Sequence, residues 1–345
     1  MDLDARKLRI LETIIDEYVL SAAPVGSRSV SRSAGFNLSS ATIRNEMADL
    51  EEMGFLEQPH TSAGRIPSDK AYRLYVDRMM NRAQLSEGEI REIRSHFTGK
   101  VDAVNSALRQ TAKALSSITH YTAMVLAPEI GNDRLKHIQL VPLMPGKALL
   151  VVVTETGFAK DAIVHVPEDM DAQALGKLST MITERLKGTR IDLVPEAINT
   201  VLTGELGDKR AFLNGLAETV SRRIAASGHQ VELSGAVNML HYPEYSDPDK
   251  ARSFLAAVEG KETLYGMLKK ASTVEFTITI GSENEHEPLR DCSVVTATYS
   301  MGDMPMGSIG VIGPTRMNYA KVVSVLEYMR KSLGEILTTC IEEDR

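Results

Sequence analysis

The stretch that most constrains what this chain can fold into runs over 39–68 and reads SSATIRNEMADLEEMGFLEQPHTSAGRIPS. Its first half predicts a helix over 40–53. Ile43, Met47 and Leu50 fall within one narrow sector when successive residues are turned by about 100°. Such a seam of apolar side chains needs a core to pack against. The first half therefore predicts a helix that is buried on one side and ends at a glycine.

The second half predicts a two-stranded ribbon. The segments FLEQPH and GRIP flank the turn TSAG, and this arrangement is typical of a hairpin. We expect Arg65 at the tip of the ribbon and His60 at its base. Upstream, apolar spacing and the breaks at PVG and Gly35 predict two more helices, over 4–20 and 27–34.

The outward side of the central predicted helix is small and polar near its N-terminus. Ala41, Asn45 and Ala48 occupy the sector opposite the apolar seam, and Thr42 and Arg44 flank it. Small residues let a helix axis approach the base edges in the major groove of DNA. There an asparagine can bond adenine bidentately, and an arginine can do the same with guanine. Asn45 and Arg44 are therefore the candidate base readers.

A local excess of positive charge surrounds this helix. From 21 to 45 the chain carries three arginines and no acidic residue, although its net charge is −7. Hydroxyls near the helix N-terminus can donate to phosphates beside the free backbone N–H groups. An arginine at a ribbon tip can contact phosphate or enter a narrow minor groove. The candidate DNA contacts are Arg28, Arg32, Ser39, Ser40, Thr42, Arg44, Asn45, His60 and Arg65.

The same pattern also fits a domain that does not bind DNA. Helix, turn, helix and hairpin recur in many small domains, and a lone asparagine on a helix is commonly just solvated. Spacing and charge on their own leave both interpretations open.

Near 80–90 the chain changes from helical to mixed α/β character. Ser86 and Glu89 form a capping-box pattern, and apolar spacing predicts a long linking helix over 86–118. Sheet-like sequence near 120–127 resumes near residue 230, which suggests a domain inserted within another. The predicted strands are YTAMVLA, LKHIQLVPL, KALLVVVT, AKDAIVHV, VELSGAVNML, VEFTITIG, CSVVTATY and GSIGVIGP; the predicted later helices are two or three within 171–227, DPDKARSFLAAVE, and an amphipathic helix over 317–340.

No sequence pattern indicates catalysis or a metal site. His286, in SENEHEP, is best explained as part of a solvated loop, and the glycines of MGSIGVIGP lack the GK[ST] ending of a phosphate loop. No GxSxG or HExxH motif is present. We expect no enzyme activity, no metal and no cofactor. Two cysteines without CxxC spacing, no long apolar run and a charged N-terminus favour a cytoplasmic protein without membrane contact.

The motif SSATIRNEMADLEEMGFLEQPHTSAGRIPSDKAYRLYVD resembles the signature of the HrcA family of heat-inducible transcription repressors. RKLRILETIIDEYVLSAAPVGSRSVS, VELSGAVNML and GSIGVIGPTRMNY resemble the family as well. The likeness therefore spans the chain, and it is loosest over about 134–227.

The resemblance implies an α+β multidomain protein with three parts. These are a winged helix-turn-helix over 1–85, a linker helix with a GAF-like α/β domain over 86–133 and 228–345, and an inserted α+β dimerisation domain over 134–227. It also implies a homodimer that binds an inverted-repeat operator, called CIRCE, in double-stranded DNA. The chaperonin GroEL is the implied partner that modulates repression, which is lost on heat stress. A metabolite-sensing regulator, with a ligand in the GAF-like domain, and an adaptor whose winged helix binds protein are the alternatives.

Overall fold

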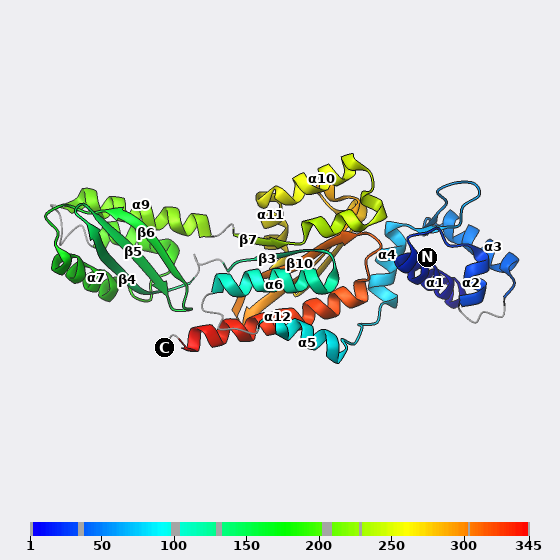
Figure 1. The fold of residues 1–345 in the computed structure, drawn as a ribbon, viewed down its shortest axis with the longest axis horizontal. Helices are drawn as coiled ribbons and strands as arrows, with labels where there is room; N and C mark the ends of the chain where they lie inside the picture. Colours follow the sequence, from blue (N-terminus) through cyan, green and yellow to red (C-terminus); the bar gives the residue numbers. More distant parts are fainter. Residues whose placement is uncertain are drawn as a thin grey trace.

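The computed structural model describes residues 3–33, 38–97, 104–128, 133–201, 209–227, 230–302 and 304–343. The molecule is elongated, with three parts in a row (Figure 1). We call residues 3–80 the head, residues 133–227 the lobe, and the five-stranded sheet between them, with its helices, the body. In the described residues no helix is both long and apolar enough to cross a membrane.

In its described residues, 3–33 and 38–80, the head has three helices before a two-stranded ribbon and a fourth helix after it. Asp4 begins the first helix by accepting a hydrogen bond from the Lys7 N–H at 2.8 Å. Ile10 and Ile14, on the inner face of this helix, are fully buried. The three helices expected from the sequence are confirmed. The elements are α1 (Ala5–Ser21), α2 (Ser27–Ser33), α3 (Ser40–Glu52), β1 (Leu56–Glu57), β2 (Ile66–Pro67), α4 (Asp69–Leu74) and a π-helical turn, η1 (Tyr75–Met79).

The body is an antiparallel sheet with helices on both faces (Figure 1). Alternation along β3 sends Ala123 and Val125 toward α6 and α12, and Met124 and Leu126 toward α10 and α11. The strand order is β7-β3-β10-β9-β8. The main elements are α5 (Glu87–Ser95), α6 (Val104–Thr119), β3 (Thr122–Leu126), β7 (Val231–Ser234), α10 (Pro248–Glu259), α11 (Lys261–Ala271), β8 (Phe276–Ile280), β9 (Cys292–Met301), β10 (Met304–Pro314) and α12 (Tyr319–Glu343). Short 3-10 turns are η5 (Ala236–His241), η6 (Pro243–Tyr245), η7 (Gly281–Glu283) and η8 (Glu287–Leu289).

The lobe is an antiparallel three-stranded meander, ordered β4-β5-β6, with helices packed on one face. Ile138, Leu150 and Val164 point into its core, which also holds Leu178 and Leu213 from the helices. The elements are β4 (Leu135–Met144), β5 (Lys147–Thr154), β6 (Ala159–His165), α7 (Ala172–Leu186), η3 (Ile191–Leu193), α8 (Val194–Val201) and α9 (Arg210–Ser227).

One sheet of the body is interrupted in sequence by the lobe, as expected. β3 precedes the lobe and pairs with β7 after it, with Met124 opposite Leu233 and Val125 opposite Glu232. Among the residues that the structure describes, the lobe strands pair only with one another. The predicted strands on both sides of the interruption are therefore confirmed.

Two expectations need correction, and one helix was not expected. The single helix over 86–118 is wrong, because α5 ends at Ser95 and α6 begins at Val104. Both helices pack against the same core, so the apolar spacing continued across the break; the Gly99 position lies outside the described residues. VELSGAVNML is a strand only to Ser234, since Gly235 takes φ +73° and a side chain there would overlap Ser116. The sequence pattern did not predict α11.

Candidate nucleic-acid interface

The two faces of α3 are as the spacing predicted. Ile43 and Leu50 are fully buried and Met47 is nearly so. On the other side Arg44 and Asn45 are exposed, together with the small residues Ala41 and Ala48. A helix with this outward face can approach a groove closely while offering an amide and a guanidinium.

The start of α3 is fixed by its own side chains. Ser39 is the N-cap, and its Oγ accepts a hydrogen bond from the Thr42 N–H at 3.1 Å. Its Oγ also lies 3.0 Å from the Thr42 hydroxyl. Ser40 and Thr42 are half-buried, and Ser39 is exposed. The cap holds the first turn in shape, and phosphate donation by these hydroxyls stays a prediction.

Acidic groups on α3 are matched by cations elsewhere in the head. Lys7 Nζ lies 2.7 Å from a Glu46 carboxylate oxygen and 2.9 Å from one of Asp49. Its hydrogen bonds to Glu46, and then to Asp49, raise the pKa of Lys7 above its ordinary value. Arg65 Nη2 lies 2.7 Å from the Glu51 carboxylate. These contacts offset negative charge that would otherwise repel DNA from the far end of α3.

The arginines near the start of α3 are placed differently. Arg28 and Arg32 on α2, and Arg44 on α3, are all exposed. Within the part of the chain that the structure describes, none of the three forms an ion pair with a carboxylate. Their charge is therefore available to an anionic partner such as a phosphate backbone.

The ribbon places Arg65 and His60 the other way round from the prediction. Leu56 pairs with Pro67 and Glu57 with Ile66, so the chain turns within 58–65. His60 is exposed in that turn, where its carbonyl accepts from the Ala63 N–H at 2.8 Å. Arg65 lies at the base, half-buried against Glu51. The expectation of Arg65 at the tip was wrong.

The reason lies in a contact that a hairpin pattern cannot show. The Val25 N–H donates to the Arg65 carbonyl at 2.9 Å, and the Arg65 N–H donates to the Val25 carbonyl at 2.8 Å. The backbones also approach at Gly64, where a Cβ atom would overlap the Val25 carbonyl. Val25 thus ties Arg65 to the base of the ribbon, while the Gln58 amide holds the turn by donating to the carbonyls of Thr61 and Ala63.

Comparison with known proteins decides the family. The model for the HrcA protein C terminal domain matches residues 105–323. The heat-inducible transcription repressor HrcA of Acetivibrio thermocellus is 42% identical, covering 100% of this chain and 99% of that protein. The corresponding repressor of Ruminiclostridium cellulolyticum is also 42% identical, covering 97% of each chain.

The chain belongs to the HrcA family of heat-inducible transcription repressors.

Membership in the HrcA family implies a DNA-binding regulator of transcription rather than an enzyme. A crystal structure of a hypothetical protein, determined at 2.2 Å, is 22% identical with a TM-score of 0.67. The match covers 98% of this chain and 100% of the other chain, which shows that the two share a fold.

In the described residues no group of three or more His, Cys, Asp or Glu side chains could hold a metal ion. Burial raises the pKa of the Cys292 thiol to about 12, which leaves it unsuited to nucleophilic chemistry.

Sequence reasoning about this HrcA-family head missed the contribution of α1. Lys7 forms an ion pair with Glu46, which lies about forty positions later in the chain. Arg6 Nη1 also lies 3.3 Å from a carboxylate oxygen of Glu46. The two cations together neutralise this acid. The available signal was two cations in the first turn of α1, where the helix dipole favours anions. No local pattern connects those cations to α3, so only the tertiary structure identifies their partners.

Proposed function

We propose that this HrcA-family member represses heat-shock chaperone operons in the cytoplasm by binding the inverted-repeat CIRCE operator. The observation that carries this proposal is a set of three arginines beside the small outward face of α3: Arg28, Arg32 and Arg44 are exposed and form no ion pair with any residue that the structure describes. In this account Asn45 and Arg44 read base edges in the major groove. Hydroxyls of Ser39, Ser40 and Thr42, together with Arg28, Arg32 and His60, contact phosphates or the adjacent minor groove.

The three parts of the molecule support a division of labour. We assign residues 1–85 to a winged helix-turn-helix, on the strength of three helices followed by a ribbon. Residues 86–133 and 228–345 form a linker and a GAF-like domain around the five-stranded sheet. Residues 134–227 form an inserted domain, because they have a separate hydrophobic core. The inserted domain is the proposed dimerisation element.

An open face of the lobe supports dimerisation. Val141 on β4, Leu149 on β5 and Ile163 on β6 lie opposite one another across the sheet. Val141 is 40% exposed and Ile163 is 62% exposed, on the side away from the lobe helices. A contiguous apolar row is typical of an interaction surface. A two-fold axis through it would present two heads to an operator with two-fold symmetry.

The oligomeric state tests this surface. We expect Ile163→Asp to shift the protein from dimer to monomer in analytical ultracentrifugation. The matched control is Asp161→Asn, on the same exposed side of β6. If the Ile163→Asp variant still dimerises with unchanged affinity, the exposed face of the lobe is not the dimer interface.

Operator binding with and without chaperonin tests the function as a whole. Fluorescence anisotropy would compare a CIRCE-type duplex with a scrambled duplex of the same composition, with GroEL present or absent. We expect tight binding to the operator duplex and not to the scrambled duplex. We also expect a larger fraction of the repressor to bind the operator when GroEL is present. Equal affinity for both duplexes contradicts operator recognition. Indifference to GroEL contradicts its modulating role.

A cavity favours one second candidate, a regulator that senses a metabolite. A space of about 470 Å³ lies between the body and the lobe, lined by Leu126, Phe158 and Met306, with Lys269 and Asp133 also on its wall. Volumes of this order suit small ligands. A thermal-shift screen of metabolites distinguishes the candidates. Operator affinity that follows a metabolite and ignores GroEL supports this second function.

A further inference from the structure

The head is joined to the body by an irregular segment and by a set of side-chain contacts. The segment over 80–85 lies in no helix or strand, and four of its six residues are exposed. A connection of this kind does not hold one orientation by itself. Contacts between head and body, most of them made by α4, must therefore hold the orientation of the head.

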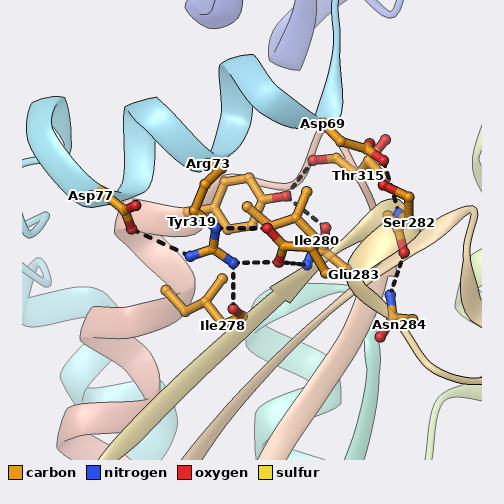
Figure 2. Close-up of polar contacts among 12 residues, drawn as sticks. Asp69, Arg73, Asp77, Ile278, Ile280, Ser282, Glu283, Asn284, Thr315 and Tyr319 are labelled. Carbon is orange, nitrogen blue, oxygen red and sulfur yellow. Dashed lines mark hydrogen bonds and ion pairs between the residues drawn. The ribbon is translucent and has the colours of Figure 1, made fainter. Parts of the chain in front are cut away.

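The first contact is made by Asp69 at the start of α4. Its carboxylate accepts a hydrogen bond from the Ser282 N–H at 2.8 Å, across the boundary between head and body (Figure 2). Gly281 takes φ +51°, and a Cβ atom there would overlap the Asp69 carboxylate. The body thus leaves a space at a glycine that the Asp69 side chain occupies.

The second contact is made by Arg73, one turn further along α4. Its Nε donates to the Glu283 carboxylate at 2.8 Å, and its Nη2 donates to the Ile278 carbonyl at 2.6 Å (Figure 2). Nη2 is also ion-paired with Glu283, so the pair is bidentate. Glu283 is itself held by the Ile280 N–H, which donates to it at 2.8 Å. Arg73 therefore engages both a carboxylate and an edge of β8.

An apolar contact and a second arginine complete the junction. Tyr72 packs on Tyr319 with ring centroids 5.9 Å apart, and each residue is 1% exposed. Arg316, which is 8% exposed, donates from Nη1 to the Val19 carbonyl near the end of α1 at 2.9 Å and is ion-paired with Glu244. Together with the contacts of Asp69 and Arg73, this makes four separate points of contact, which restrict rotation of the head on the body.

We propose that Asp69 and Arg73 form a latch that fixes the orientation of the head on the body, and so sets the half-site separation that the dimer accepts. This inference rests on the proposed function for its DNA consequence. Asp69 and Arg73 are positioning residues, since they face the body rather than the predicted reading surface. With the latch closed, two heads in one dimer can engage half-sites at one spacing and one rotational phase.

The first test measures operator affinity as the spacer between half-sites is lengthened or shortened by about one to five base pairs, up to half a helical turn. We expect wild-type binding to fall sharply away from the native spacing. In Arg73→Ala and Glu283→Gln the ratio of affinity at the native spacing to affinity at altered spacings should fall by about tenfold. A change of this size is expected because each substitution removes charge-assisted hydrogen bonds. Binding to a single half-site should not change. Arg252→Ala, an exposed arginine of α10, is the matched control.

The second test needs no DNA. Spin labels at Glu52→Cys on α3 and Glu262→Cys on α11, in a Cys340→Ser background, would report the distance between head and body in the full chain. We expect one narrow distribution in the latched protein and a broad one in Arg73→Ala and Glu283→Gln, with circular dichroism confirming that both variants fold. Distributions of unchanged width overturn the latch. A broad distribution with an unchanged spacer profile overturns its role in setting spacing. If the wild type fails to prefer operator over scrambled DNA, the proposed function fails, while the distance widths still decide whether the latch exists.

Discussion

The head uses arginine in two opposite ways on its two sides. Toward solvent, Arg28, Arg32 and Arg44 are exposed and form no ion pair within the described residues. Toward the body, Arg73 is partly buried and engages a carboxylate and a carbonyl at once. An unpaired cation gains most from a polyanion through release of counterions. A paired, partly buried one is already neutralised and instead fixes geometry. Placement, rather than residue type, therefore separates the proposed DNA contacts from the contact that joins head and body.

The largest effect is expected on the outward side. Arg44→Ala or Asn45→Ala should cost roughly 1–3 kcal/mol of operator binding, because in the proposed interface each removes a bidentate partner for a base. Gel shifts on operator and scrambled DNA measure the difference. Equal losses on both duplexes would show that neither side chain reads sequence.

The base of the ribbon is held by backbone contacts with Val25 inside the head, so a change there should act on stability. Gly64→Ala places a methyl group against the Val25 carbonyl and should cost about 1–2 kcal/mol of stability through overpacking. Thermal unfolding gives the loss. Gly26→Ala, where a Cβ would meet nothing within 4 Å, is the matched control. Comparable stability of the two variants would refute the tight approach at Gly64.

Smaller changes are expected from the arginines of α2. Arg28→Ala and Arg32→Ala should weaken binding to operator and scrambled DNA alike. Each should lower the slope of log affinity against log salt by about one, if each neutralises one phosphate. A salt titration by anisotropy measures the slope. An unchanged slope in both variants would place these arginines outside the interface.

Arg65 should give the smallest effect. Its guanidinium is paired with Glu51, so Arg65→Ala should cost about 0.2–1 kcal/mol of stability and change the salt slope less than Arg28→Ala does. The salt titration and thermal unfolding, run side by side, separate the two arginines. A full unit of slope lost in Arg65→Ala would return it to the phosphate-contacting set.

Much of the fold was accessible from sequence because it depends on local periodicity. The buried seam of α3 followed from three- and four-residue spacing, and the strands of the body and lobe followed from short apolar segments between turns. The predictions failed at positions whose place in the fold depends on contacts with residues far away in the sequence. Arg65 sits at the ribbon base because Val25, forty positions earlier, pairs with its backbone. The Arg73–Glu283 pair joins residues 210 positions apart. Neither contact leaves a pattern in either segment alone.

The candidate interface divides in the same way. The exposure of Arg44 and Asn45 is a property of one helix, and a helical wheel is enough to predict it. The neutralisation of Glu46 and Asp49 by Lys7 requires α1 to cross α3, which no spacing rule expresses. Sequence therefore identified the outward residues, while their electrostatic setting emerged only with the packing of the head.

A loss-of-contact measurement tests base reading by α3 most directly. Each base pair of the operator half-sites would be substituted in turn, symmetrically, and bound by the wild type and by Asn45→Ala. If Asn45 reads a base, the variant becomes indifferent to substitution at one symmetric pair of positions and keeps the wild-type penalty elsewhere. The same penalties at every position in both proteins would contradict recognition through the outward face of α3.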